Sequence, residues 1–295
     1  MASPTLASMA LGRQLQKFRE RAGLSQNAVA RAVEMSPQTY GRLEDGVKQN
    51  LTTLLTNALC DTLSVSTEER QQLHLLAEEV RKQHKSGERG WWRPYIDDLR
   101  KGFEYYLRLE ENALRMTHVH LNLIPGLLQT GEYRRQLLWA EFPQQSPEEI
   151  QKFVGLLIQR QQRLDDPRFE LEAFVPEEVL RRPIGGPGVM VEQLHHLATA
   201  AERPNVTFRV IPQSVANPLV FAADTFVHLS FPMLPNTKLT PPPIVFVEAF
   251  AGALYLTGEN EVAKYRDAIP TIRRVALDPG ATRDLVMMIA REFAS

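Results

Sequence analysis

The sequence is poor in cysteine and has no long apolar run. Its 295 residues include one cysteine, Cys60, which excludes a disulfide within the chain and agrees with a reducing compartment. No stretch approaches the ~20 consecutive apolar residues of a membrane-spanning helix. The N-terminus also lacks the basic segment and apolar core of a signal peptide. We therefore expect a cytoplasmic protein without a membrane segment.

Net charge is also close to zero, at −1. A chain this neutral is not expected to coat nucleic acid along its whole length. The charge is uneven, however, because residues 1–50 hold seven Lys and Arg against four Asp and Glu. A modestly basic head on a mildly acidic body is typical of a DNA-binding module joined to a separate module.

Patterns typical of metal and phosphate sites are missing. His118 and His120 are two residues apart and His195 and His196 are adjacent, but a metal site needs convergent ligands with a carboxylate or thiolate nearby, and Cys60 is far away in the sequence. The Gly-Gly-Pro-Gly run at 185–188 lacks the spacing of a phosphate-binding loop. We predict no metal and no cofactor.

Evidence for catalysis is weak. No Ser–His or Cys–His nucleophile pattern occurs, and the acidic residues Glu177, Glu178 and Asp224 are the remaining candidates for acid–base chemistry. Because Glu177 and Glu178 follow Pro176, they suit the first turn of a helix better than a catalytic pair. An enzyme that processes a small molecule stays an alternative, and we predict that the protein is not an enzyme.

Residues 24–46 carry the clearest signal, which predicts two short helices joined by a tight turn. Ser25 and Ser36 are suitable N-caps, and Pro37 stands at a first helical position, where its missing N–H costs nothing. Gly46 supplies a stop. This arrangement is typical of a helix-turn-helix, whose second helix enters the DNA major groove. Binding of a protein by the same helices is the alternative.

The letters L-S-Q at 24–26 and R-L-E-D-G at 42–46 resemble the Xre (lambda/434-repressor-like) helix-turn-helix family. The resemblance implies that Arg19 pairs with Glu44, and that the first turn of the second helix faces the groove. It assigns to the DNA interface Gln26, Ser36, Pro37, Gln38, Thr39 and Arg42. The sequence departs from many relatives at Pro37 and Gly41, which leaves fewer side chains for base contacts.

The rest of the chain predicts a multi-domain protein. Apolar spacing indicates a helix over 9–22, and two more helices after the helix-turn-helix, which gives an all-α five-helix domain over 1–85. A polar linker follows at 86–90. The larger second domain, 91–295, has a helical first part (91–165) and an α/β (α+β) part (166–295) with a mixed sheet. Strands are expected at 115–121, 169–175, 206–211, 225–231, 244–249 and 253–257.

Five ordered motifs in the second half resemble another family. They are I-P-G-L-L-Q-T-G-E-Y (124–133), R-Q-Q-R-L (160–164), V-L-R-R-P-I-G-G-P-G-V-M (179–190), P-N-V-T-F-R-V-I-P (204–212) and V-E-A-F-A-G-A-L-Y-L (247–256). Together they resemble the domain of unknown function 5753, which occurs behind Xre-type heads in bacterial regulators. The resemblance implies transcriptional regulation, often alongside a short acidic partner protein encoded nearby.

These observations predict a nucleoid-associated regulator that binds a pseudo-palindromic operator as a homodimer. Its second domain would receive a small partner protein or a small-molecule effector. The main alternative is an antitoxin-like adaptor that chiefly binds a partner protein. Its docking surface would be the apolar loops at 212–222 and 232–243, with Val220 and Phe221 exposed.

Overall fold

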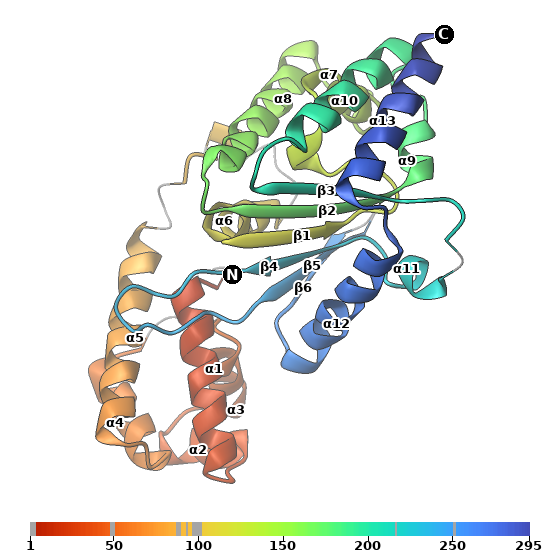
Figure 1. Cartoon of the computed structure of the whole chain (residues 1–295). Coiled ribbons are helices and arrows are strands. Elements are labelled where there is room, and N and C mark those ends of the chain that lie inside the picture. Colours follow the sequence, from red (N-terminus) through yellow and green to blue (C-terminus); the bar gives the residue numbers. More distant parts are fainter. Residues whose placement is uncertain are drawn as a thin grey trace. The chain divides into compact units, whose positions relative to one another are not determined.

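A computed structural model describes residues 4–47, 51–86, 90–92, 94–95, 102–215, 217–249 and 252–295. The chain forms two compact units (Figure 1). The first, called the head here, comprises Met1–Trp91 and the segment Phe231–Pro242, which we call the connector. The second, called the tail, comprises Trp92–Ser230 and Pro243–Ser295. No helix in the described ranges has the length and apolar character needed to cross a membrane.

The helices of the head follow one another with short turns, and they confirm the predicted helical N-terminal region. They are α1 (Leu6–Arg21), α2 (Gln26–Ala32), α3 (Pro37–Glu44), α4 (Thr53–Thr62) and α5 (Thr67–Ser86). α1 begins earlier than the apolar spacing indicated. Thr5 Oγ1 accepts the Ser8 N–H (3.2 Å) and Ser8 Oγ accepts the Thr5 N–H (2.8 Å), a reciprocal cap that fixes the start at Leu6.

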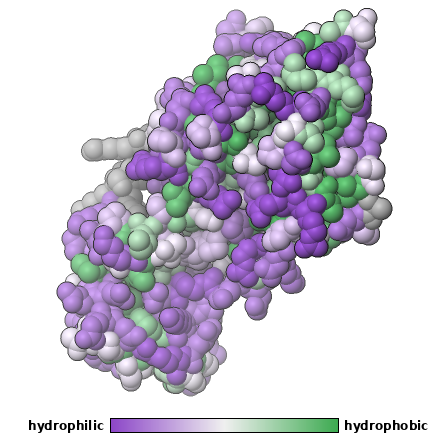
Figure 2. Space-filling view, in the orientation of Figure 1, coloured by the Kyte–Doolittle hydropathy of each residue, from purple (hydrophilic) through white to green (hydrophobic). Residues whose placement is uncertain are grey.

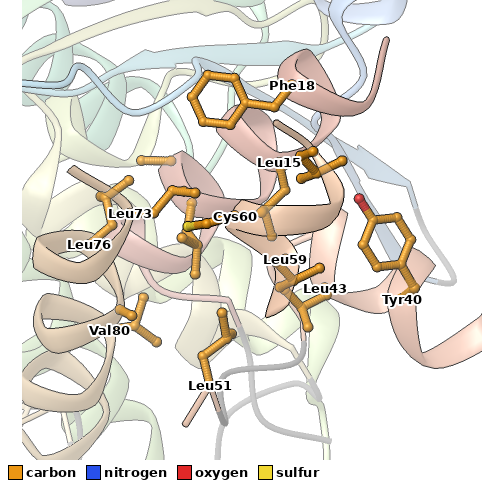
Figure 3. Packing of buried hydrophobic residues seen from close by; sticks show 14 of the residues in the cluster. Leu15, Phe18, Tyr40, Leu43, Leu51, Leu59, Cys60, Leu73, Leu76 and Val80 are labelled. Atoms are coloured by element: carbon orange, nitrogen blue, oxygen red, sulfur yellow. The ribbon is translucent and has the colours of Figure 1, made fainter. Parts of the chain in front are cut away.

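One apolar core joins these helices. Leu15 of α1, Leu43 of α3, Leu59 of α4 and Leu76 of α5 are each at most 1% exposed and belong to one cluster (Figure 3). Cys60 lies in the same cluster and is fully buried. Short helices such as α2 and α3 bury too little surface to be stable alone, so this shared core holds them in place.

The connector contributes to the core of the head. Leu234 is 4% exposed within the cluster, and Leu239 packs against it. The Leu234 N–H donates to the Leu239 carbonyl (2.8 Å) and the Lys238 N–H donates to the Leu234 carbonyl (3.0 Å), which closes a compact turn. Residues 232–243 form a loop, as their prolines predicted, but one whose leucines pack inside the head.

Val220, in the other loop suggested for docking, is fully buried, so the prediction that it is exposed is wrong. It lies on the short helix α11 (Pro218–Ala222) and packs in the tail core beside Phe226 and Val262. The Phe221 side chain lies outside the described residues.

The tail contains a mixed sheet, which confirms the predicted fold class. In the described part of the chain, six strands pair in the order β3-β2-β1-β4-β5-β6 (Figure 1). They are β1 (Arg115–Val119), β2 (Glu170–Pro176), β3 (Val206–Ile211), β4 (Phe226–Ser230), β5 (Ile244–Ala249) and β6 (Gly252–Leu256). β1, β2 and β3 run parallel, and β4, β5 and β6 continue antiparallel from β1.

Helices connect the strands of the tail and cover them. They are α6 (Phe103–Asn112), α7 (Gly131–Glu141), α8 (Pro147–Gln161), α9 (Glu177–Arg181), α10 (Pro187–Ala200), α11, α12 (Glu259–Val275) and α13 (Pro279–Ala294). α12 packs on the sheet face that carries Val119 and Val245. α6 covers the opposite face, where the Tyr106 and Phe246 ring centroids are 4.5 Å apart. Strands covered on both faces are mostly apolar. β2 is buried beyond its first residue and is apolar there except at Glu172, whose carboxylate accepts two hydrogen bonds from Arg273 (2.7 Å each).

Candidate nucleic-acid interface

α3 has one buried side and one exposed side. Tyr40 and Leu43 are at most 1% exposed and point into the core, whereas Pro37, Gln38 and Arg42 are exposed. Tyr40 and Leu43 are three residues apart, and Gln38 and Arg42 are four apart, so each pair lies on one side of the helix. A helix only eight residues long therefore presents a short polar surface outward.

Local capping sets where α2 and α3 begin. Ser25 Oγ accepts the Ala28 N–H (3.2 Å), and Ser36 Oγ accepts the Thr39 N–H (3.1 Å). Glu34 adopts a positive φ of 52° in the turn between them. The start of α3 also carries the positive end of the helix dipole, which favours an anion.

A buried carboxylate holds α3 against the rest of the head. The Glu44 side chain is 4% exposed and accepts a bidentate pair from Arg19, with Nε–Oε1 at 2.6 Å and Nη2–Oε2 at 3.0 Å. Arg19 Nη1 also donates to the Leu24 carbonyl (3.2 Å), and Gln26 Nε2 donates to Glu44 Oε2 (2.7 Å). The hydrogen bond to Glu44 raises the pKa of the Arg19 guanidinium. One carboxylate thus ties the end of α3 to α1 and to the start of α2.

Gly12 allows α1 to touch the end of α3. A Cβ at Gly12 would lie 2.0 Å from the Glu44 carbonyl oxygen and 2.8 Å from that of Leu43. Since no side chain can occupy that space, the two helices pack backbone to backbone. This contact and the Glu44 ion pair together fix the orientation of α3.

The structure places most of the sequence-predicted interface residues on one exposed part of the head, and it brings Arg19 and Glu44 together. Exposed residues of this set are Gln26, Ser36, Pro37, Gln38 and Arg42, while Thr39 is half-buried. Hydrophilic side chains cover much of the head surface seen in Figure 2. Sequence reasoning missed the bond from Gln26 to Glu44, because no short-range pattern signals a contact between residues 18 positions apart.

The tail contains a buried polar network that the sequence did not reveal. Glu110 of α6 and Arg160 of α8 form a bidentate pair at 2.8 and 2.9 Å. Gln193, fully buried on α10, accepts the Thr130 N–H (2.7 Å) and donates to the Leu128 carbonyl (2.8 Å). The two Gln193 bonds hold the Ile-Pro-Gly-Leu-Leu-Gln-Thr motif in place, which gives that motif a structural role.

The residues weighed for metal binding do not converge in the described ranges, where no three His, Cys, Asp or Glu side chains form a possible metal site. His118 is 4% exposed on β1, and burial lowers the pKa of its imidazole to about 3. Glu177 lies in the first turn of α9, where it accepts hydrogen bonds from Arg181 (2.8 Å) and the Gln213 N–H (3.3 Å). These contacts account for the Glu177 carboxylate as part of the fold.

The fold and the head geometry define a class: a helix-turn-helix protein with a larger mixed-sheet domain behind it. The family model described as "Helix-turn-helix domain" matches residues 10–73. The family model described as "Domain of unknown function (DUF5753)" matches residues 103–288, more than half of the chain. The chain therefore belongs to the DUF5753 family, and it carries a helix-turn-helix head. No curated protein and no solved structure matches it.

Proposed function

We propose that this protein is a sequence-specific, DNA-binding transcriptional regulator whose head places α3 in the major groove. The observation that carries the proposal is the two-sided α3. Its outer side exposes Gln38 and Arg42, and its inner side is locked by Glu44 and Arg19. A recognition helix needs this combination, because base contacts require side chains at the surface of a helix whose orientation is fixed.

Each exposed residue has a role that its chemistry supports. Gln38 suits the bidentate edge of adenine, and Arg42 suits guanine or a phosphate. Ser36, Thr39 and Gln26 lie at the starts of the two helices, where hydroxyl, amide and backbone N–H groups hold phosphates. Pro37 adds an apolar contact and no donor.

One head covers only one half-site, so we propose that two copies bind a pseudo-palindromic operator. Half-sites would lie about 34 Å apart, or a multiple of that distance. In this proposal the protein acts in the cytoplasm on the nucleoid, and its tail binds a small partner protein or a small-molecule effector. Such a ligand regulates DNA binding only if its affinity differs between the DNA-bound and free arrangements. The helix-turn-helix match points to a DNA-binding regulator, and we propose no enzymatic activity.

The adaptor alternative keeps only part of its proposed surface, where Leu219 (42% exposed) and Met233 (59% exposed) are the apolar side chains that remain accessible. Val220 is buried in the tail and Leu234 is buried in the head, so neither offers a side chain to a partner. Binding of a partner protein elsewhere on the tail is compatible with the regulator proposal and does not require a separate function.

The test is selection of random duplex DNA by the full-length protein, followed by sequencing. Gln38→Ala and Arg42→Ala are compared with Lys82→Ala, an exposed residue of α5 whose partner is Glu78 on the same helix. We expect an enriched palindrome for the wild type and for Lys82→Ala. The two α3 variants should lose about 1–3 kcal/mol of discrimination at the base each contacts. Equal enrichment of the same motif by all four proteins would remove α3 as the recognition helix.

A further inference from the structure

The two outer edges of the tail sheet differ in how they are covered. At the β3 edge, the Val210 N–H donates to Thr282 Oγ1 (3.2 Å), and the Val210 carbonyl accepts the Leu277 N–H (2.8 Å). The Arg209 guanidinium donates to the carbonyls of Leu277 (2.7 Å) and Ala276 (2.9 Å). The segment from Ala276 to Thr282 thus occupies the β3 edge.

The β6 edge has no such cover among the described residues. β6 pairs with β5 on one side, and no other described strand pairs with it on the second side. Gly252, Ala253 and Leu254 are exposed, with Leu254 at 61%. An uncovered strand edge offers a row of backbone donors and acceptors to any other strand.

β6 also lacks the features that prevent pairing of an open edge. The sequence contains no charged residue and no proline from Ala249 to Gly258. Proteins that stay monomeric protect such edges with lysine, proline or a bulge. An uncharged edge strand without these protections is instead a template for pairing with a strand of another chain.

We propose that β6 is the dimer interface, where β6 of a second copy of this chain pairs with it antiparallel about a two-fold axis at Leu254. This inference rests on the proposed function, which requires two heads on one operator. Antiparallel pairing of identical strands generates the two-fold axis that a palindromic operator requires. The two sheets then form one continuous sheet across the dimer.

The sequence of β6 is complementary to itself in this register. Leu254 lies opposite Leu254 of the second copy, Ala253 lies opposite Tyr255, and Gly252 lies opposite Leu256. Each large side chain outside the centre therefore faces a small one, which lets the two strands approach without a clash. Leu254 lies on the same face of the sheet as Val247 and Phe226, the face that α12 covers. The two Leu254 side chains of the dimer therefore contact each other on that face.

The strand is held in the conformation that pairing needs. The Tyr255 ring lies 4.7 Å from that of Tyr105 and 5.1 Å from that of Phe246, and its hydroxyl donates to the Gly102 carbonyl (2.9 Å). A strand already fixed against its own domain loses little conformational entropy when a second strand joins it. Glu248 and Glu259, the nearest charged residues in the sequence, lie outside the five paired positions.

The test measures self-association of the full chain by analytical ultracentrifugation over a concentration series. Leu254→Lys places two like charges opposite each other at the axis and should weaken the dimer at least about tenfold. Met288→Lys, at an exposed position of α13, is the matched control and should leave the dimer unchanged. A wild-type monomer at every concentration overturns the proposal. A dimer that Leu254→Lys leaves intact overturns it as well.

A second variant tests the register. Leu254→Cys puts two thiols at directly opposed positions, where Cβ atoms can approach to about 4.5 Å and a disulfide can form. Cys60, the only other cysteine, is buried. We expect oxidation to cross-link Leu254→Cys into dimers and Met288→Cys not to cross-link. Failure of Leu254→Cys to cross-link in a dimeric protein rejects the two-fold axis at Leu254.

Failure of this interface and failure of the proposed function give different results. If the wild type enriches a palindrome while Leu254→Lys stays dimeric, the regulator proposal stands and the dimer forms elsewhere. If the β6 dimer forms and no DNA motif is enriched, the interface stands and the regulator proposal falls.

Discussion

Replacement of Leu234 by alanine tests whether the connector is part of the head. Leu234 lies 148 residues after Ser86, the last residue of α5, yet its side chain is 4% exposed within the core of α1–α5. If that packing stabilises the head, a mutation inside the tail's sequence range will weaken the helix-turn-helix. An exposed loop leucine would not have this effect.

The expected cost follows from the buried side chain. Leu→Ala removes three carbons, which at about 0.8 kcal/mol each gives about 2.4 kcal/mol of lost transfer free energy. The space left behind adds to this, because the turn closed by the Leu234 and Leu239 backbones limits collapse. We expect Leu234→Ala to cost the head about 3 kcal/mol. Its neighbour Met233, 59% exposed, provides the control Met233→Ala, with an expected cost within about 0.5 kcal/mol.

Hydrogen exchange measured by mass spectrometry on the full chain separates the two units. A loss of about 3 kcal/mol speeds exchange of the most protected amides in α1 and α5 by roughly 150-fold, while tail amides keep their rates. Protection in α1 and α5 that is the same in Leu234→Ala and Met233→Ala would refute the argument. Such a result would show that the connector lies on the head without stabilising it.

Two other predictions concern buried charge. Arg19→Ala leaves the Glu44 carboxylate, 4% exposed, without its guanidinium, and should cost about 3–5 kcal/mol in urea unfolding; a loss under about 1 kcal/mol would contradict a buried role for the pair. His118 has a folded pKa of about 3, below its unfolded value of ~6.5, so the unfolded chain binds the proton first as pH falls. Stability is therefore full above pH ~6.5 and is lost below it, by about 2 kcal/mol at pH 5. His118→Leu should remove this contribution, and an unchanged pH dependence would reject it.

Local chemistry explains what could be predicted from the sequence. Ser25 and Ser36 cap helices because a hydroxyl next to a free N–H needs only neighbouring residues, and both caps form. The 206–211 strand was also found at its predicted bounds, since alternation is a property of the strand itself. The helix start at Leu6 was missed because its capping pair, Thr5 and Ser8, precedes the apolar stripe that located the helix.

Long-range packing explains what could not be predicted. Prolines indicate that residues 232–243 form a loop, but they do not indicate that Leu234 packs in the core of the head. The Glu110–Arg160 pair joins residues 50 positions apart, and each alone is an ordinary charged residue on an amphipathic helix. Local sequence signals predicted the arrangement of α2 and α3 at the interface. The proximity of Arg19 and Glu44 was expected only from the family resemblance.

The connector changes how the head and tail are linked through the chain. A head made only of the first 86 residues would join the tail through one linker. In this protein the chain passes between the units three times, near Trp91, at Ser230 and at Pro242. The last two crossings follow β4 and precede β5, two paired neighbours in the sheet. The connector, and with it the buried Leu234, is therefore joined covalently to two neighbouring strands of the tail sheet, in addition to the link near Trp91.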